Sequence, residues 1–348
     1  MSPVRVGGNH YPCLVSRAGT LTLVAILGSA LAAEILLAPV VLGAVPAPSV
    51  RVAILTSLSI TLPSRGPASF VAELQRLGYV QKRNLTIDFR SAKEKPGQLP
   101  NLARELVGLK PDVILTLGTV DSTVAAMNAT ATIPIVFVTA VDPVRTGLVA
   151  SLARPGGNVT GVTSLNADLG AKRLELLTEI VPSVRRVAVL VNPVDPETPS
   201  MVGTVKSAAR ARRVDLNLVE IRDSAGLGGA VNDVAKAGAR ALLVLGSPPL
   251  YRLSPSLAEL TTKHRLPAVS AWREFPEAGG LASYGTNLPE MFQRAAGLVD
   301  RILRGAKPAD LPIEQPTKFE LIVNMKTAKA TGFTFSESFL AQANRLIE

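Results

Sequence analysis

From residue 51 onward, hydrophobic and polar positions alternate in a way that predicts strands and helices in turn. Short apolar or alternating runs predict strands, and the amphipathic stretches between them predict helices. In chain order, the expected elements of the first half cover residues 51–56, 68–77, 84–89, 99–109, 112–117, 121–128 and 134–139. Apolar strands that alternate with helices are typical of a parallel sheet covered on both faces, so the pattern predicts an α/β fold.

The same order of elements recurs in the second half of the chain. Residues 186–191 (RVAVLV) repeat the pattern of residues 51–56 (RVAILT) at an offset of 135 positions. Two further landmarks, at residues 245–247 and 266–269, follow their first-half counterparts at offsets of 128 and 133 positions. This nearly constant spacing predicts two lobes of one design, each a doubly wound, Rossmann-like unit. Common descent of the two lobes stays an open alternative.

Short segments are expected to connect the two lobes. The chain crosses between them near residues 158–163, 279–287 and 318–324, and such crossings make a multi-strand hinge with a cleft. In open α/β sheets, ligands bind beyond the carboxyl ends of the strands. Both sets of strand ends would face this cleft.

The lobe boundaries follow from these crossings. We expect the first lobe to comprise residues 49–162, with residues 286–317 returning to it, and the second lobe to comprise residues 163–285. The segment 318–348 is assigned to the second lobe, and its return to the first lobe stays open.

Residues 1–48 differ from the rest of the chain. Arg5 and Arg17 precede a long apolar run over residues 21–45 that only Glu34 interrupts, which is the pattern of a secretory signal peptide. The alternative is an uncleaved membrane anchor, because the run is long enough to span a bilayer. Glu34 near its middle weighs against an anchor, so we expect an exported, periplasmic protein.

The composition narrows the chemistry that the chain can carry. Its 348 residues include one cysteine and two histidines, which excludes a disulfide framework and a Cys/His zinc site and argues against Cys–His catalysis. The formal net charge of +10 comes from scattered lysines and arginines, and this indicates a solvated basic surface rather than nucleic-acid binding. We expect no metal, no cofactor and no nucleic-acid partner.

Several stretches of the chain from residue 51 onward resemble the sequences of a known protein family. They cover residues 78–80, 84–87, 110–114, 133–137, 142–144, 147–161, 172–177, 273–275 and 314–321, and residues 147–161 read GLVASLARPGGNVTG. With these stretches the chain resembles the periplasmic substrate-binding components of ABC transporters, in particular the group that includes tryptophan-binding proteins. The resemblance implies a type I periplasmic-binding-protein fold, capture of a small, amino-acid-like solute by lobe closure, and delivery to a membrane permease. We expect a monomer.

Two other classes of protein use a similar two-lobed scaffold. An effector-binding transcriptional regulator needs a DNA-reading helix-turn-helix before the lobes, and the apolar residues 1–48 offer none. Proteins that resemble amino-acid racemases use paired cleft cysteines, whereas the single Cys13 would be lost with the signal peptide. We therefore expect a binding protein and not an enzyme, with an effector-binding sensor as the alternative.

Polar residues gather where the expected strands end. Beyond Gly118, the first N–H groups of a helix and the hydroxyls of Thr119 and Ser122 could hold an anion such as a carboxylate. Asp142 follows another strand and could pair with a ligand ammonium. Helix capping is the alternative for these polar side chains. If both sites exist, the ligand carries both charges, as an amino acid does.

Aromatic and acidic residues of the second lobe complete the candidate site. Trp272 and Tyr284 flank the second crossing, where a ring could stack on a planar ligand, with packing between the lobes as the alternative. Family members often carry a Tyr-Gly pair where this chain has Ala271-Trp272, a departure that bears on the choice of ligand. Asp195 and Glu197 are interpreted as exposed turn carboxylates. The expected ligand-binding residues are Thr56, Ser57, Gly118, Thr119, Ser122, Thr139, Asp142, Thr163, Ser164, Asn192, Gly246, Ser247, Trp272 and Tyr284.

Overall fold

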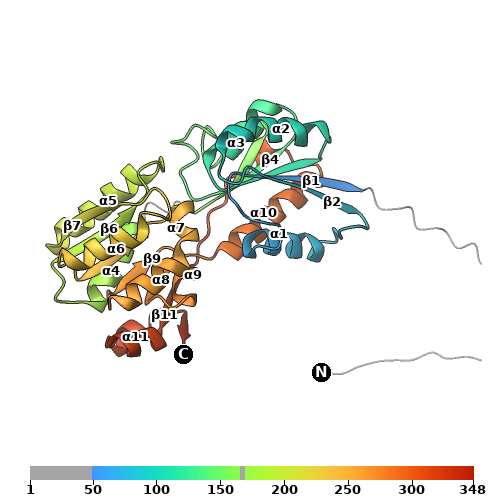
Figure 1. The fold of residues 1–348 in the computed structure, drawn as a ribbon. Helices are drawn as coiled ribbons and strands as arrows, with labels where there is room; N and C mark the ends of the chain where they lie inside the picture. The colour runs from blue at the N-terminus through green and yellow to red at the C-terminus, as the bar shows by residue number, and fades with distance from the viewer. Residues whose placement is uncertain (1–48, 165–168) are drawn as a thin grey trace, which may run out of the picture. The chain divides into compact units, whose positions relative to one another are not determined.

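The computed structural model describes residues 49–164 and 169–348, so the expected signal peptide over residues 1–48 lies outside the described residues. Two open sheets, flanked by helices, organise the described chain (Figure 1). The first sheet has the strand order β2-β1-β3-β4-β5, and all of its strands run parallel. These strands are β1 (Val50–Thr56), β2 (Leu85–Ser91), β3 (Val113–Leu117), β4 (Ile135–Thr139) and β5 (Val159–Thr163). The strands predicted for the first half are confirmed.

Helices cover both faces of the first sheet, as Figure 1 shows. They are α1 (Arg65–Arg76), α2 (Leu99–Gly108), α3 (Val120–Ala129) and α10 (Leu288–Leu303), with the short 3-10 helices η1 (Pro96–Gln98) and η3 (Pro308–Asp310). Side chains of a strand point to alternate faces, so Val52 and Ile54 of β1 pack with α1 and α10, while Ala53 and Leu55 pack with α2 and α3. The near-continuous apolar sequence of β1 follows from this two-sided burial.

The second sheet has the order β12-β11-β10-β9-β8-β6-β7. Its strands are β6 (Arg186–Val191), β7 (Asp215–Glu220), β8 (Ala241–Val244), β9 (Ala268–Ser270), β10 (Ala282–Thr286), β11 (Phe319–Asn324) and β12 (Arg345–Ile347). The part β7-β6-β8-β9-β10 is parallel and repeats the order of the first sheet strand for strand. The predicted pair of doubly wound, Rossmann-like units is therefore confirmed. β11 then adds antiparallel to β10, and β12 pairs parallel with β11.

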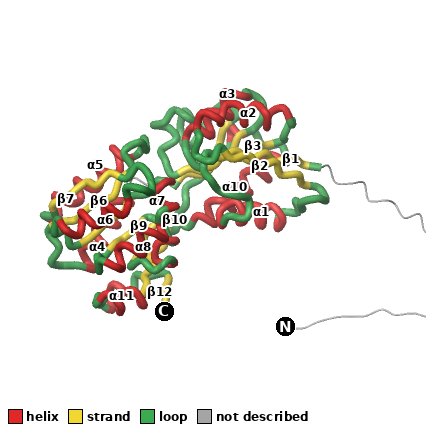
Figure 2. Tube along the Cα trace, viewed as in Figure 1, coloured by secondary structure: helices red, strands yellow, loops and turns green. Residues whose placement is uncertain are grey.

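Helices also cover both faces of the second sheet (Figure 2). They are α4 (Leu169–Ile180), α5 (Thr198–Arg212), α6 (Leu227–Lys236), α7 (Pro248–Arg252), α8 (Ser254–Lys263), α9 (Glu274–Glu277), α11 (Met325–Thr331) and α12 (Glu337–Leu340). Val187 and Val189 of β6 pack with α4 and α5, while Ala188 and Leu190 pack with α6 and α8. No helix within the described ranges has both the length and the apolar character that spanning a membrane requires.

The chain passes between the two sheets at segments that lie close together. It leaves the first sheet after β5, returns to it from β10 through Asn287 into α10, and leaves it again before β11. The last of these segments runs beside β5, because the N–H of Thr163 donates to the carbonyl of Glu314 at 3.0 Å and the N–H of Glu314 donates to that of Gly161 at 2.9 Å. We refer below to each sheet with its helices as the first and the second lobe. Both belong to one compact unit of the chain.

Candidate ligand-binding cavity

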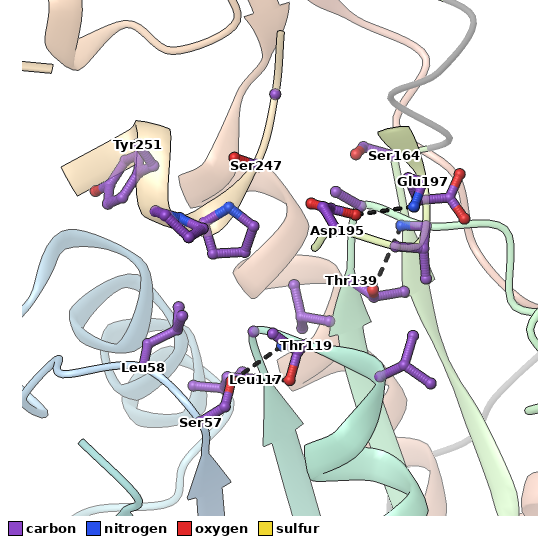
Figure 3. Close-up of a pocket in the computed structure, with 18 of the residues that line it drawn as sticks. Ser57, Leu58, Leu117, Thr119, Thr139, Ser164, Asp195, Glu197, Ser247 and Tyr251 are labelled. Atoms are coloured by element: carbon purple, nitrogen blue, oxygen red, sulfur yellow. Dashed lines mark hydrogen bonds between the residues drawn. The ribbon is translucent and has the colours of Figure 1, made fainter. Parts of the chain in front are cut away.

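A cavity of about 570 Å³ lies between the carboxyl ends of the two sheets. Residues that follow β1, β3 and β4 line it from the first lobe, and residues that follow β6, β8 and β9 line it from the second (Figure 3). This is the position that the strand topology favours for a ligand, because loops with free polar groups collect there. Of the residues expected from the sequence, the cavity wall includes Ser57, Gly118, Thr119, Thr139, Ser164, Asn192, Gly246, Ser247 and Trp272.

The turn between β3 and α3 forms a donor-rich part of the wall. The hydroxyl oxygen of Ser57 accepts hydrogen bonds from the N–H of Thr119 at 3.2 Å and from its hydroxyl at 3.1 Å (Figure 3). Gly118 has a φ of +94°, and a Cβ there would lie 2.8 Å from Ser57 Oγ and 2.8 Å from Leu58 Cγ, so this turn requires glycine. The first N–H groups of α3 have no partner within their helix and can bind an anion.

Asp142 lies outside the cavity wall and makes local hydrogen bonds instead. Its Oδ1 atom accepts from the N–H of Val144 at 2.9 Å and from that of Arg145 at 3.2 Å. The structure thus shows the capping arrangement that was the alternative for this residue, here in a turn rather than at a helix start.

Four more expected residues also lie outside the wall. The Thr56 hydroxyl accepts from the N–H of Leu58 at 3.1 Å, and the Thr163 hydroxyl donates to the carbonyl of Val141 at 2.6 Å. Ser122 is 0% exposed in the first turn of α3, and its hydroxyl has no hydrogen-bond partner among the described residues. Tyr284 packs against Phe319 of the second sheet, with ring centroids 6.1 Å apart. The cavity wall includes none of these four residues.

The second lobe offers fewer free donors to the cavity than the first. The side-chain oxygen of Asn192 accepts from the N–H of Val194 at 3.3 Å, so its amide N–H groups are the donors left. Ser247 caps α7 by accepting from the N–H of Leu250 at 3.5 Å. The first two residues of α7 are Pro248 and Pro249, which have no N–H. The helix start after β8 therefore lacks the anion-binding groups that the matching start after β3 presents.

An aromatic pair forms one side of the second-lobe wall. The rings of Tyr251 and Trp272 meet edge to face, with centroids 5.3 Å apart and planes at 80°. The Tyr251 hydroxyl donates to Glu274 Oε1 at 3.4 Å, and burial together with the negative charge of Glu274 raises the pKa of Tyr251 to about 12. Tyr251 is therefore neutral at physiological pH. Its position four residues after the Gly246-Ser247 landmark was the sequence signal that could have identified it.

Asp195 and Glu197 both line the cavity, and the expectation of an exposed pair was wrong, because Glu197 is 4% exposed and Asp195 is half-buried. The loop after β6 begins with a tight turn, since the N–H of Asp195 donates to the carbonyl of Asn192 at 3.2 Å. Asp195 Oδ1 accepts from the N–H of Glu197 at 2.9 Å (Figure 3). The Glu197 carboxylate also pairs with Arg145. Burial raises the pKa of Asp195 and of Glu197, and Arg145 offsets part of the effect at Glu197.

The rest of the wall is largely apolar. It includes Leu58, Ile60, Pro67, Leu117, Val138, Val141, Met201, Leu288, Met291 and Phe292. An apolar wall that also carries helix N–H groups and carboxylates suits a small solute that has an apolar body and a polar head.

Comparison with known proteins agrees with this arrangement. Residues 64–347 match the sequence model of the family described as ABC transporter substrate binding protein. A tyrosine-binding protein of Clostridioides difficile (strain R20291) is 28% identical over 263 residues, which cover 75% of this chain and 74% of that protein.

Two solved structures share the fold. A conserved domain protein from Vibrio cholerae O1 biovar El Tor is 27% identical, with a TM-score of 0.78 over 86% of this chain and 99% of that one. An ABC domain from Streptococcus pneumonia, in complex with L-Trp, is 22% identical, with a TM-score of 0.78 over 86% of this chain and 100% of that one. The strand orders and these likenesses together show the type I periplasmic-binding-protein fold. The chain therefore belongs to the family of ABC transporter substrate-binding proteins, whose members are binding proteins and not enzymes.

Proposed function

We propose that this protein is the extracytoplasmic solute receptor of an ABC importer and that it captures an amino-acid-like molecule between its lobes. The observation that carries the proposal is the cavity of about 570 Å³ at the facing strand ends of the two lobes. Its size falls within the range of roughly 300–1,000 Å³ that is usual for small-molecule sites.

The distribution of polar groups around the cavity favours a zwitterionic ligand. The first N–H groups of α3 and the hydroxyl proton of Ser57, whose oxygen accepts from Thr119, suit a carboxylate, and the acidic residues of the loop after β6 suit an ammonium group. Between these two ends, the apolar wall and the ring of Trp272 suit an aliphatic or aromatic side chain. A relative that is named a tyrosine-binding protein supports this class of ligand.

Ion pairs between the lobes support capture by hinge closure. Arg65 of α1 pairs with Glu277 of α9 at 2.9 Å, and Glu94 pairs with Arg252 of α7. Together with the Arg145–Glu197 pair, they connect the first lobe to the second around the cavity. Partly exposed pairs contribute only about 0–1 kcal/mol each, so they favour the closed arrangement without preventing release to a membrane permease.

The proposed location follows from the N-terminal sequence. The signal pattern over residues 1–48 offers small-residue cleavage sites at residues 30–32 and 45–47. Mass spectrometry of the protein recovered from the periplasmic fraction should find a new N-terminus after one of them. An intact residue 1 on protein held in the membrane fraction would instead show an uncleaved anchor.

A thermal-unfolding screen of the exported chain tests the proposal. A ligand at about 100 times its Kd stabilises the folded state by about 2.7 kcal/mol, which a melting curve detects. We expect one or more apolar L-amino acids to raise the melting midpoint, and succinate and glutamate to leave it unchanged. No shift with any of the twenty amino acids and their amines would contradict the proposed ligand class.

A further inference from the structure

The ionisable residues of the cavity wall share one sign of charge. The charged ones are Glu94, Asp121, Asp195 and Glu197, Tyr251 is neutral, and the wall residues that the structure describes include no lysine, arginine or histidine. A ligand carboxylate would therefore meet only N–H and hydroxyl dipoles, whereas a ligand cation would meet full negative charges.

Three of the four carboxylates already have a partner. Glu94 pairs with Arg252, and Glu197 pairs with Arg145. Asp121 lies in the first turn of α3, where the helix dipole favours a negative charge, and its Oδ2 is 3.4 Å from the Thr119 hydroxyl.

Asp195 is the wall carboxylate whose charge stays uncompensated. Its Oδ1 atom accepts one backbone N–H, that of Glu197 at 2.9 Å, and no cation within residues 49–164 and 169–348 pairs with it. The two proline positions around it, Pro193 and Pro196, limit the conformations of its loop. Figure 3 shows the Asp195 carboxylate on the side of the loop that faces Ser247 and Thr119, while the Glu197 carboxylate extends away from them.

The surroundings of Asp195 hold more negative than positive charge. Glu197 interacts with the charges of both Asp195 and Asp142, and Arg145 is the cation that opposes them. Glu197 is 4% exposed, and its Oε1 atom has no hydrogen-bond partner among the described residues. A buried carboxylate oxygen without a donor is costly unless a cation approaches the group.

We propose that Asp195 binds the ammonium group of the ligand and thereby makes the site select amines over acids. This inference rests on the proposed capture of a solute in the cavity and specifies which end of the solute the second lobe recognises. It assigns to Asp195 the role that the sequence pattern had offered to Asp142. It also predicts that the site depends more on the amino group of the ligand than on the carboxylate.

Calorimetric titration of the exported chain with matched ligands tests this inference. The ligands are L-tyrosine, its decarboxylated form tyramine, and its deaminated form 3-(4-hydroxyphenyl)propionate, with the corresponding tryptophan series in parallel. We expect removal of the amino group to weaken binding by roughly 30-fold or more, and removal of the carboxylate to weaken it by roughly 10-fold.

Variants of the acidic residues identify the group responsible. Asp195→Asn keeps the acceptor for the Glu197 N–H and should weaken the binding of the amino acid and the amine by roughly 30- to 1,000-fold, without weakening the deaminated acid further. Asp195→Glu should restore part of the affinity. Asp142→Asn, which lies outside the wall, is the matched control and should change affinity less than about 3-fold.

Each outcome separates this inference from the proposed function. Tight binding of the deaminated acid to the wild-type chain, or an unchanged amine affinity in Asp195→Asn, would overturn the role of Asp195 while solute capture stands. A loss in Asp142→Asn equal to that expected for Asp195→Asn would move the role to Asp142. If the wild-type chain binds none of these compounds and no amino acid, the proposed function itself fails.

Discussion

The starts of α3 and α7 show how two copies of one design reach different chemistry. Both helices follow a strand at the same place in its sheet, and both are preceded by a glycine and a hydroxyl residue, Gly118-Thr119 and Gly246-Ser247. α3 continues with residues that have N–H groups, whereas α7 continues with Pro248-Pro249, which have none. The first lobe therefore presents donors to the cavity.

The loops after β1 and β6 also occupy corresponding places in the two lobes and differ in the side chains that they bring to the cavity. The loop after β6 places Asp195 and Glu197 in the cavity wall, while the corresponding loop after β1 contributes Ser57, Leu58 and Ile60. The helix N–H groups of the first lobe, opposite the unpaired Asp195 of the second, favour a ligand with unlike ends, held in one orientation. Shared topology thus fixes where the ligand binds, and local sequence decides which end of it each lobe receives.

Apart from the Asp195 variants, Gly118→Ala is expected to weaken ligand binding most. Gly118→Ala places a Cβ 2.8 Å from Ser57 Oγ at a φ of +94°, so the donor-rich turn must shift. Because Ser57 and Leu58 of the cavity wall must shift together with the donors, we expect a loss of about 1–3 kcal/mol in the free energy of unfolding and a loss of roughly 100-fold in amino-acid affinity. Chemical denaturation and calorimetric titration measure the two quantities.

Gly97→Ala, in the same lobe, is the control for this prediction, because no described residue beyond the chain neighbours of Gly97 has an atom within 4 Å of the Cβ position there. It should leave both quantities nearly unchanged. Wild-type affinity in Gly118→Ala would show that the first lobe does not hold the carboxylate.

Trp272 is expected to have the next largest effect. Trp272→Ala removes an aromatic side chain from the cavity wall and from its edge-to-face contact with Tyr251, and should weaken ligand binding by roughly 10- to 50-fold. Tyr284→Ala removes an aromatic that lies outside the wall, so it should lower the melting midpoint and leave affinity nearly unchanged. Equal losses of affinity in both variants would show that a place in the cavity wall does not distinguish Trp272 from Tyr284.

A smaller effect is expected for the ion pairs between the lobes. Arg252→Gln removes the partner of Glu94 and should weaken ligand binding by roughly 2- to 5-fold, with less dependence on salt than the wild type shows. Arg76→Gln removes an exposed pair with Glu73 inside α1 and should not change affinity. Titrations at low and high salt compare the two variants.

The smallest effect concerns the stability of the ligand-free protein. Burial raises the pKa of Asp195 above its ordinary value of 3.8, so its charged form is disfavoured in the folded state. This cost is absent below pH 3.8, grows as the pH rises from 3.8 to the raised pKa, and is fully present above it. Asp195→Asn should therefore melt at a higher temperature than the wild type at pH 7, with the difference vanishing in acid.

Asp142→Ala gives the contrast for that measurement. It removes the acceptor of two backbone N–H groups and should lower the melting midpoint through a loss of about 1 kcal/mol. Scanning calorimetry without ligand, at a series of pH values, measures both variants. A lower midpoint for Asp195→Asn at pH 7 would show that the Asp195 charge stabilises the fold.

The sequence predicted the fold well because two-sided burial leaves a strong pattern. Strands such as β1 and β6 are apolar along their length, and the offset between them revealed the repeat. The strand ends could be located in the same way, and Ser57, Thr119 and Asn192, which were expected there, line the cavity.

The parts of the wall that were missed depend on how loops fold back. Nothing in the local sequence pattern shows that Glu197, in the loop after β6, is buried at the cavity wall. Asp142 has the same sequence context as a ligand-binding acid, and only the turn geometry directs its Oδ1 atom to the N–H of Val144. Side-chain direction in loops is set by tertiary contacts, which hydrophobic periodicity does not encode.

A crystal structure of the exported chain grown with L-tyrosine or L-tryptophan would show whether the cavity holds an amino acid and in which orientation. We predict one amino acid enclosed between the lobes, with its nitrogen within hydrogen-bond distance of Asp195 and its carboxylate at the start of α3. A ligand in the reversed orientation, or bound anywhere other than this cavity, would contradict it.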